Sequence, residues 1–406
     1  MSGLAILNGR LVLADCVVAG GVLVRERQIV AVGSFDVPDD VDTLDAEGAL
    51  IAPGLVDAGV FAIDLPAFTA GGITRAALMP DQSPALDHAA LVQRAAQAGK
   101  PDAWIHPIAA ATRALDGIDL AEIGLMKAAG ACAVSSGRGW IADSGVMHRL
   151  LAYAAALDLV VIAHPEDGGL VAGAVATEGE TATRLGLPAA PAAAEAIAIA
   201  RDIALARETG ARLHFRQVTT SRGFDLVRQA KRDGIRVTCG VTPAHLFLSD
   251  TAIGPFRTFA RLSPPLREDS DRQAALRAIA DGTIDLICSA HDPHGPEAKR
   301  LPFADAVPGM AGAETLLALS LGLVRDGLID LPRLFDLLAT TPARLLGLPG
   351  GRLTEGQEAD LILVDEDRPW RIDADRLAAR EGNTPFDGLP VQGHVLRVLK
   401  GGAWRG

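Results

Sequence analysis

Two short segments concentrate the side chains of this chain that could do hydrolytic chemistry. One is His164-Pro165-Glu166-Asp167, and the other is Cys288-Ser289-Ala290-His291-Asp292-Pro293-His294. Neutral imidazoles and carboxylates are ligands that zinc takes in proteins, and they also serve as general acids and bases. A mononuclear metal site built from His164, His291 and His294 is therefore one hypothesis.

Each of these side chains also has a structural interpretation. A single imidazole without partners is a weak metal ligand, so His164 is expected to be a hydrogen-bonded polar residue. Glu166 and Asp167 are expected to bond loop backbone and to cap the helix that follows. The segment 291–294 is expected to be a strand-end loop held by its own side chains. Residue types alone leave these alternatives open.

The middle of the chain must position these groups, and it contains eight apolar runs typical of buried strands. Ala-rich helical segments lie between most of them, which predicts a (β/α)8 TIM barrel of α/β class. A doubly wound sheet is the competing fold, but its Gly-rich phosphate turn is absent from the sequence. The runs are 55–61, 74–79, 103–108, 132–135, 159–164, 212–218, 236–242 and 285–291.

Both ends of the chain have a different pattern. Brief runs rich in Val, Leu and Ile alternate with turns such as Asn8-Gly9 and Gly401-Gly402, which is typical of a meander or sandwich. Two β-rich ends can pair with each other around a long insertion. We therefore predict one composite β-sandwich domain, made of residues 1–52 and 349–406, and a barrel domain over residues 53–348.

Composition excludes several classes of function. The chain has 406 residues, 49% of them apolar and 22% charged, which is the balance of a globular protein. The net charge of −12 argues against nucleic acid and against anionic membranes as partners. The longest apolar stretch, 150–163, is too short to span a bilayer. With no targeting segment visible, the expected location is the cytoplasm. Four well-separated cysteines suggest buried thiols in a reducing compartment: Cys16, Cys132, Cys239 and Cys288.

Seven segments, taken in chain order, resemble dihydroorotase, a pyrimidine-synthesis enzyme of the amidohydrolase superfamily. The match runs over nearly the whole chain, and it implies an amidohydrolase-type barrel with the composite β domain. The segments are Pro53-Gly54-Leu55-Val56-Asp57, Ala77-Leu78-Met79-Pro80-Asp81, His164-Pro165-Glu166-Asp167, Val241-Thr242-Pro243-Ala244-His245-Leu246, Ser263-Pro264-Pro265-Leu266-Arg267, Cys288-Ser289-Ala290-His291-Asp292-Pro293-His294 and Asn383-Thr384-Pro385-Phe386.

The resemblance also implies a zinc site and a substrate clamp, but this chain departs from the family at those positions. Gly59 and Phe61 stand where the family has its strand-one histidine pair. Gln217 stands in place of the strand-six histidine, and Ala290 in place of the strand-eight aspartate that is the general base. Ile63 stands where the family's arginine binds the substrate carboxylate. None of these replacements keeps the chemistry of the family residue.

We therefore predict a catalytically inactive dihydroorotase-like protein, which is not an enzyme and has no catalytic residues. No cofactor is expected, and zinc enters only under the alternative given below. The pocket at the strand ends is expected to be vestigial and to hold Asp81, His164, His291 and His294.

The resemblance implies a partner as well. Some inactive relatives act as structural subunits that assemble aspartate carbamoyltransferase, so we expect the catalytic chain of that enzyme as partner and a homo-oligomer. One alternative is a divergent cyclic-amide hydrolase with an altered or mononuclear metal site. Another is a small-molecule sensor whose pocket is lined by Asp81, Arg216 and His294.

Overall fold

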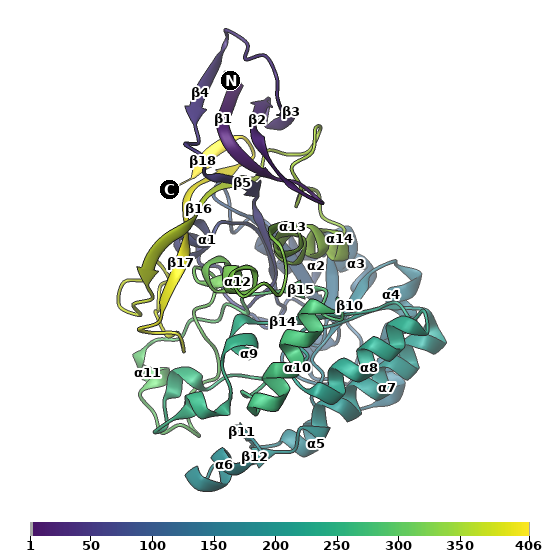
Figure 1. Cartoon of the computed structure of the whole chain (residues 1–406). Coiled ribbons are helices and arrows are strands. Elements are labelled where there is room, and N and C mark those ends of the chain that lie inside the picture. Colours follow the sequence, from purple (N-terminus) through teal and green to yellow (C-terminus); the bar gives the residue numbers. More distant parts are fainter. Residues whose placement is uncertain (1–2, 406) are drawn as a thin grey trace.

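Two eight-stranded sheets organise the chain (Figure 1). The computed structural model describes residues 3–405. One sheet is wholly parallel and curls into a nearly closed barrel, and the other is built from both ends of the chain. The barrel lies below the second sheet in Figure 1, with α5 (Gly168–Val171) and α6 (Glu180–Leu185) at its far end.

The barrel strands follow one another in chain order, and each lies within or overlaps one of the eight predicted runs. The predicted (β/α)8 barrel is therefore confirmed. Its strands read as continuous apolar runs because both faces of a parallel sheet are covered. They are β6 (Leu55–Val60), β7 (Ile73–Leu78), β8 (Trp104–Ala110), β9 (Ala133–Ser135), β10 (Val160–Ala163), β13 (Arg212–Phe215), β14 (Val237–Val241) and β15 (Leu286–Ile287).

Hydrogen bonds beyond the strands draw β6 and β15 together. The Phe61 N–H donates to the His291 carbonyl at 2.8 Å. Ser289 donates to the Asp57 carboxylate from its backbone N–H, at 3.2 Å, and from its hydroxyl. Asp57 is wholly buried, and its pKa is raised by that burial against these hydrogen bonds. The seam of the barrel is thus held by residues within or just after its first and last strands.

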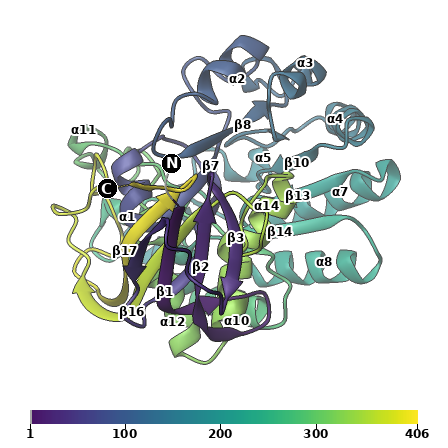
Figure 2. The ribbon, with the colours of Figure 1, turned by 90° about the horizontal axis from the view of Figure 1, so that it is seen from above.

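Helices cover the outside of the barrel, as the view in Figure 2 shows for α4, α7 and α8. In α8, Phe224, Val227 and Ala230 are buried at intervals of three residues, so one stripe of the helix faces the sheet. The longer helices are α4 (Ser144–Ala156), α7 (Ala193–Thr209), α8 (Ser221–Arg232), α10 (Asp269–Ala280) and α12 (Leu316–Arg325). Shorter ones are α1 (Leu65–Gly71), α2 (Ala89–Ala95), α3 (Ile123–Ala128), α9 (Pro243–Phe247), α11 (Pro296–Lys299), α13 (Leu331–Phe335) and α14 (Thr341–Leu346).

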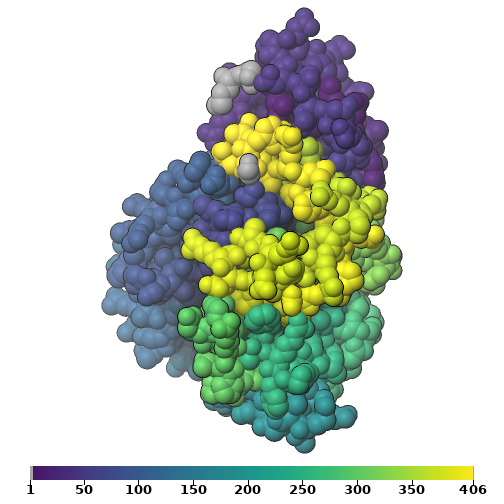
Figure 3. Space-filling view, turned by 90° about the vertical axis from the view of Figure 1, so that its left-hand side faces the viewer, coloured from purple at the N-terminus to yellow at the C-terminus, as the bar shows by residue number. Residues whose placement is uncertain are grey.

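The second sheet joins the two ends of the chain. Strand β5 pairs in parallel with β1 and antiparallel with β16, so an N-terminal and a C-terminal strand lie side by side. Figure 3 shows the yellow C-terminal segment packed between the purple N-terminal strands and the barrel. The strands are β1 (Gly3–Val12), β2 (Val17–Arg25), β3 (Gln28–Gly33), β4 (Val41–Asp45), β5 (Leu50–Pro53), β16 (Leu361–Arg371), β17 (Pro390–Lys400) and β18 (Ala403–Arg405).

A buried arginine ties the barrel to this sheet. Arg75 of β7 is 2% exposed, and its Nη2 lies 2.6 Å from a Glu358 carboxylate oxygen and 2.7 Å from one of Asp360. Its guanidinium also lies 5.5 Å from the ring centroid of Trp104. Because both carboxylates lie just before β16, this cluster fixes the C-terminal strands against the barrel.

Within residues 3–405, no helix is long and apolar enough to cross a bilayer. All four cysteines are free. Cys239 and Cys288 are buried as predicted, whereas Cys16 and Cys132 are only half-buried.

Candidate functional site at the mouth of the barrel

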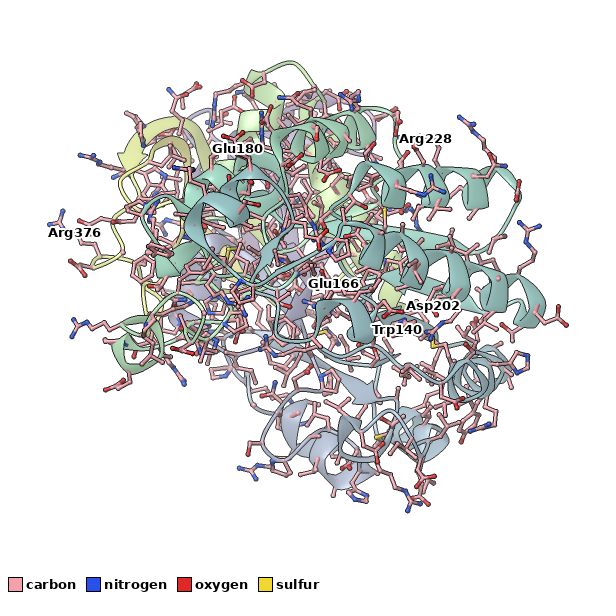
Figure 4. All side chains as sticks on the ribbon, turned by 90° about the horizontal axis from the view of Figure 1, so that it is seen from below. Trp140, Glu166, Glu180, Asp202, Arg228 and Arg376 are labelled. Carbon is pink, nitrogen blue, oxygen red and sulfur yellow. The ribbon has the colours of Figure 1, made fainter. Side chains whose placement is uncertain are left out.

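A pocket of about 220 Å³ opens where the barrel strands end, and a smaller hollow of about 20 Å³ adjoins it. Figure 4 looks at the molecule from this side, with Glu166 near the centre of the barrel. The two cavities share Arg138, Leu262, Ser263 and Pro308 in their walls. The larger is also lined by Trp140, His164, Glu166 and Arg261, and the smaller by Phe61, Arg216, Gln217 and Ala290.

His164, directly after β10, is held between a cation and an anion. The Arg216 Nη2 donates to His164 Nδ1 at 2.9 Å, so the ring proton is on Nε2. That Nε2 lies 3.2 Å from a Glu166 carboxylate oxygen. Burial lowers the pKa of His164, against the opposing effect of Glu166. The imidazole is therefore neutral near pH 7, as a general base must be.

Glu166 is the ionised member of this pair. Burial alone raises its pKa, but the hydrogen bond with His164 and the charge of Arg267 hold it at about 2. The Arg267 Nη2 donates to the second Glu166 oxygen at 2.8 Å. The sequence predicted that Glu166 and Asp167 bond loop backbone. Asp167 does, because it accepts the Gly169 N–H and caps α5, but Glu166 binds side chains instead.

A buried glutamate extends this polar network to the outer helices. Glu195 of α7 is fully buried and accepts the backbone N–H and hydroxyl groups of Thr219 and Thr220, in the loop between β13 and α8. The Arg267 Nε donates to the Thr219 hydroxyl at 2.8 Å, and its Nη2 lies 3.6 Å from Glu195. His164, Glu166, Arg267 and Glu195 thus form one chain of alternating partners. Sequence reasoning did not assign Arg267 or Glu195 to the site. For Arg267, the available signal was a charged residue at the end of the apolar segment Pro264-Pro265-Leu266.

Two guanidiniums stack on Phe61. Arg138 lies 3.7 Å and Arg216 lies 5.0 Å from the ring centroid. The Arg138 Nη2 also pairs with Asp292 at 2.8 Å. Arg138 therefore lines both cavities and is held by Asp292. The site is rich in positive charge that an anionic or strongly polarised ligand would satisfy.

The three histidines of the metal hypothesis are not brought together. His291 is fully buried, faces Asp64 at 3.4 Å, and accepts the Gly312 and Ala313 N–H groups at its Nδ1. His294 pairs with Asp292 at 3.2 Å. Within residues 3–405, no group of three or more His, Cys, Asp or Glu side chains is arranged to hold a metal ion.

The remaining members of the predicted pocket divide in the same way. Asp81 accepts the Arg138 backbone N–H at 2.8 Å and belongs to neither cavity wall. Gln217 is 2% exposed, and its Oε1 has no hydrogen-bond partner within residues 3–405. Ala290 lines the small hollow with φ of 46°, a conformation strained for alanine. Ile63 packs against the hydrophobic core, and Gly59 lies within the buried strand β6.

The wall that carries Arg138 and Trp140 is fastened to α7. The Arg201 Nη1 donates to the carbonyls of Ile141 and Ala142 at 2.7 and 3.1 Å. Its guanidinium lies 3.9 Å from the Trp140 ring centroid and pairs with Asp202 at 2.6 Å. Figure 4 shows Trp140 beside Asp202. The pocket wall therefore depends on a buried ion pair outside the barrel.

Asp202 gives this wall a measurable pH dependence. Burial raises the pKa of Asp202 to about 6, against the charge of Arg201. The folded state thus holds a proton that the unfolded state releases near pH 4, and this stabilisation is lost as the pH rises through 6. Chemical unfolding should show that, as the pH rises from 4 to 7, the free energy of unfolding of Asp202→Asn increases by about 3 kcal/mol relative to that of the wild type. The exposed Asp225→Asn should show no such trend. If the free energies of unfolding of Asp202→Asn and the wild type change with pH in parallel, the raised pKa of Asp202 is contradicted.

Comparison with known proteins places the chain in one family. The family model described as "Dihydro-orotase-like" matches residues 48–222. A dihydroorotase of Citrifermentans bemidjiense is 37% identical over 402 residues, covering 95% of this chain and 94% of the relative. One of Desulforapulum autotrophicum is 38% identical over 383 residues, covering 90% and 89%. The solved L-hydantoinase of Arthrobacter aurescens is 26% identical, with a TM-score of 0.88 over 100% of this chain and 96% of that one.

These relatives overturn two predictions from the sequence. The relatives that match nearly the whole chain are named as enzymes, so the prediction that this chain is not an enzyme is wrong. The expectation of no cofactor is wrong too, because these relatives show the family whose resemblance implies a zinc site. The sequence-based prediction rested on a few replaced positions, whereas the identity to relatives named as dihydroorotases extends over nearly the whole chain.

The donor set at the mouth does not fit that zinc arrangement. Glycine, phenylalanine and alanine side chains offer no ligand at positions 59, 61 and 290. The Nδ1 of His164 faces the Arg216 guanidinium, and a second cation placed there would be repelled. These residues therefore do not reproduce the zinc site that the family resemblance implies. With its barrel, its site at the strand ends and its relatives of 37–38% identity, the chain belongs to the dihydroorotase-like amidohydrolase family.

Proposed function

We propose that this chain is a divergent cyclic-amide hydrolase whose site departs from the family's metal arrangement. The observation that carries the proposal is the pair formed by His164 and Glu166 inside the mouth pocket. A neutral imidazole and an ionised carboxylate lie 3.2 Å apart there, between the guanidiniums of Arg216 and Arg267. His164 can thus accept a proton, and the Glu166 carboxylate beside it can stabilise the positive charge that the imidazole gains.

These residues, with Gln217, can each carry out a different part of ring opening. Arg216 is placed to turn from His164 to the amide carbonyl oxygen, whose negative charge grows as water adds to the carbon. His164, released at Nδ1, takes the proton of that water and is stabilised as a cation by Glu166. The proton then passes to the ring nitrogen as the C–N bond breaks. The unpaired Oε1 of Gln217 is suited to accept the amide N–H of the ring.

The test is a ring-opening assay on dihydroorotate, dihydrouracil and hydantoin, with and without added zinc, alongside metal analysis of the purified protein. We expect hydrolysis of at least one ring. His164→Asn should lower kcat by about 100-fold or more, since general-base catalysis contributes that much. His148→Asn, on the outer helix α4, should leave kcat unchanged. A wild-type protein that opens none of the rings, loaded with zinc or not, would refute the proposal.

We also propose that the chain associates with the catalytic chain of aspartate carbamoyltransferase and with further copies of itself. Support comes from the family resemblance, because closing the dihydroorotate ring uses the carbamoyl aspartate that the transferase makes, and opening the ring returns it. Light scattering after gel filtration should give a joint mass larger than either protein alone. Two separate peaks, at the masses of the single chains, would contradict both associations.

A further inference from the structure

Among the residues that the structure describes, one guanidinium at the mouth has no side-chain partner. Arg138 pairs with Asp292, Arg216 bonds His164, and Arg267 pairs with Glu166 and Glu195, as described above. Arg261 lines the larger pocket, and the hydrogen bond recorded for its side chain runs from Nη1 to the neighbouring Leu262 carbonyl at 3.1 Å. Its Nε has no partner within residues 3–405. Arg261 therefore contributes a positive charge that no carboxylate in direct contact neutralises.

The backbone that carries Arg261 is firmly held. Ala260 and Leu262, on either side, are buried, and the Arg261 carbonyl accepts the Gly309 N–H at 3.1 Å. The buried Lys299 donates to the carbonyls of Val307 and Gly309 at 2.7 and 2.8 Å. The two loops on this side of the pocket are thus fastened to each other, and Arg261 needs little ordering when a ligand binds.

We propose that Arg261 is the specificity-determining residue of the pocket, and that it selects a cyclic amide bearing a carboxylate over a neutral one. The inference rests on the proposed function and adds the substrate class. A carboxylate in the pocket would gain charge-assisted hydrogen bonds from a partly buried guanidinium, whereas a neutral ring would leave that guanidinium unpaired. The Asp81 carboxylate does not oppose this, because it binds the Arg138 backbone and lies outside both cavity walls.

The position of Arg261 is also distinct from that of the family's substrate arginine. That arginine follows strand one, where this chain has Ile63, which packs against the core and cannot bind an anion. Arg261 lies instead in the loop after the short 3-10 helix Thr258–Ala260, far beyond Ile63 in the sequence. The carboxylate would therefore lie against the 258–263 loop, while Arg216 stays available to the amide carbonyl.

The experiment compares dihydroorotate with dihydrouracil, two rings that differ by one carboxylate. The wild type should prefer dihydroorotate in kcat/KM. Arg261→Met should lower kcat/KM for dihydroorotate by about 10- to 100-fold through KM, in line with the loss of one charge-assisted contact. The value for dihydrouracil should stay within about twofold. Arg261→Lys should retain part of the preference, and Arg232→Met, exposed at the end of α8, should change neither ring.

The outcomes separate this inference from the proposed function. If both rings are opened without preference, or if Arg261→Met lowers both equally, the inference is wrong and the hydrolase remains. If neither ring is opened, the proposed function fails, and calorimetric binding of dihydroorotate decides the inference. Binding that Arg261→Met weakens at least tenfold supports it, and absent or unaltered binding overturns it. Thermal melting of each variant establishes that it is folded.

Discussion

Replacing Glu195 with alanine is expected to lower the free energy of unfolding by about 3–5 kcal/mol, as removal of one partner from a buried charged network does. The carboxylate is fully buried and accepts hydrogen bonds from four donor groups, the backbone N–H and the hydroxyl of both Thr219 and Thr220. Without it, those donors lose their acceptor inside the protein, and Arg267 keeps only one of its two carboxylates. Unsatisfied buried groups carry the full cost of their desolvation.

The measurement is chemical unfolding followed by circular dichroism at neutral pH. Glu208→Ala is the matched control, because Glu208 lies in the same helix α7 but is exposed, and it should change stability by less than about 0.5 kcal/mol. Because Arg267 contacts both carboxylates, removal of Glu195 should also loosen the contact between Arg267 and Glu166 in the mouth pocket. A Glu195 variant as stable as the Glu208 variant would show that the network contributes nothing.

Replacing Arg75 with methionine is expected to cost a similar amount, about 3–5 kcal/mol. Asp360, only 2% exposed in its side chain, would lose the cation that faces it. Its pKa is already raised by burial, against the charge of Arg75. The variant would therefore fold with Asp360 protonated, and its stability deficit should shrink as the pH falls below neutral, where protonation becomes easier.

Arg27→Met provides an unusually close control. Arg27 contacts the same Glu358 and lies 5.6 Å from the same Trp104 ring, but half of its side chain is exposed. An exposed ion pair is worth about 0–1 kcal/mol, so this variant should melt close to the wild type. Equal losses of unfolding free energy in the two variants would mean that burial does not strengthen the ion pairs of Arg75.

Local pattern determined the architecture of the barrel. Each barrel strand lies within or overlaps a run of apolar residues that a parallel sheet requires, and the helical segments expected between the runs include α2, α4, α7, α8 and α10. Helices such as α1, α3 and α14 were not predicted, because they are too short to show a full amphipathic period. The pairing of β5 with β16 joins residues about 300 apart, and composition suggested it without fixing its register.

The site was less accessible, because its contacts link distant residues. His164 could be found from its motif, but its partners Arg216 and Arg267 lie on other elements, and Arg267 is 101 residues from Glu166. His291 was assigned to the pocket because it follows a barrel strand. The left-handed conformation of Ala290 breaks the alternation of side chains there, and His291 points to Asp64 instead.

The sequence by itself therefore determined the barrel, the family and the face on which the site lies. It could not determine which charges neutralise one another, since each of the four mouth arginines reads alike in a sequence. Only the tertiary structure decided that Arg138, Arg216 and Arg267 are held by His, Asp or Glu side chains and that Arg261 is not. The reason is physical: the state of a buried charge is set by atoms within a few ångströms, and folding alone brings them there.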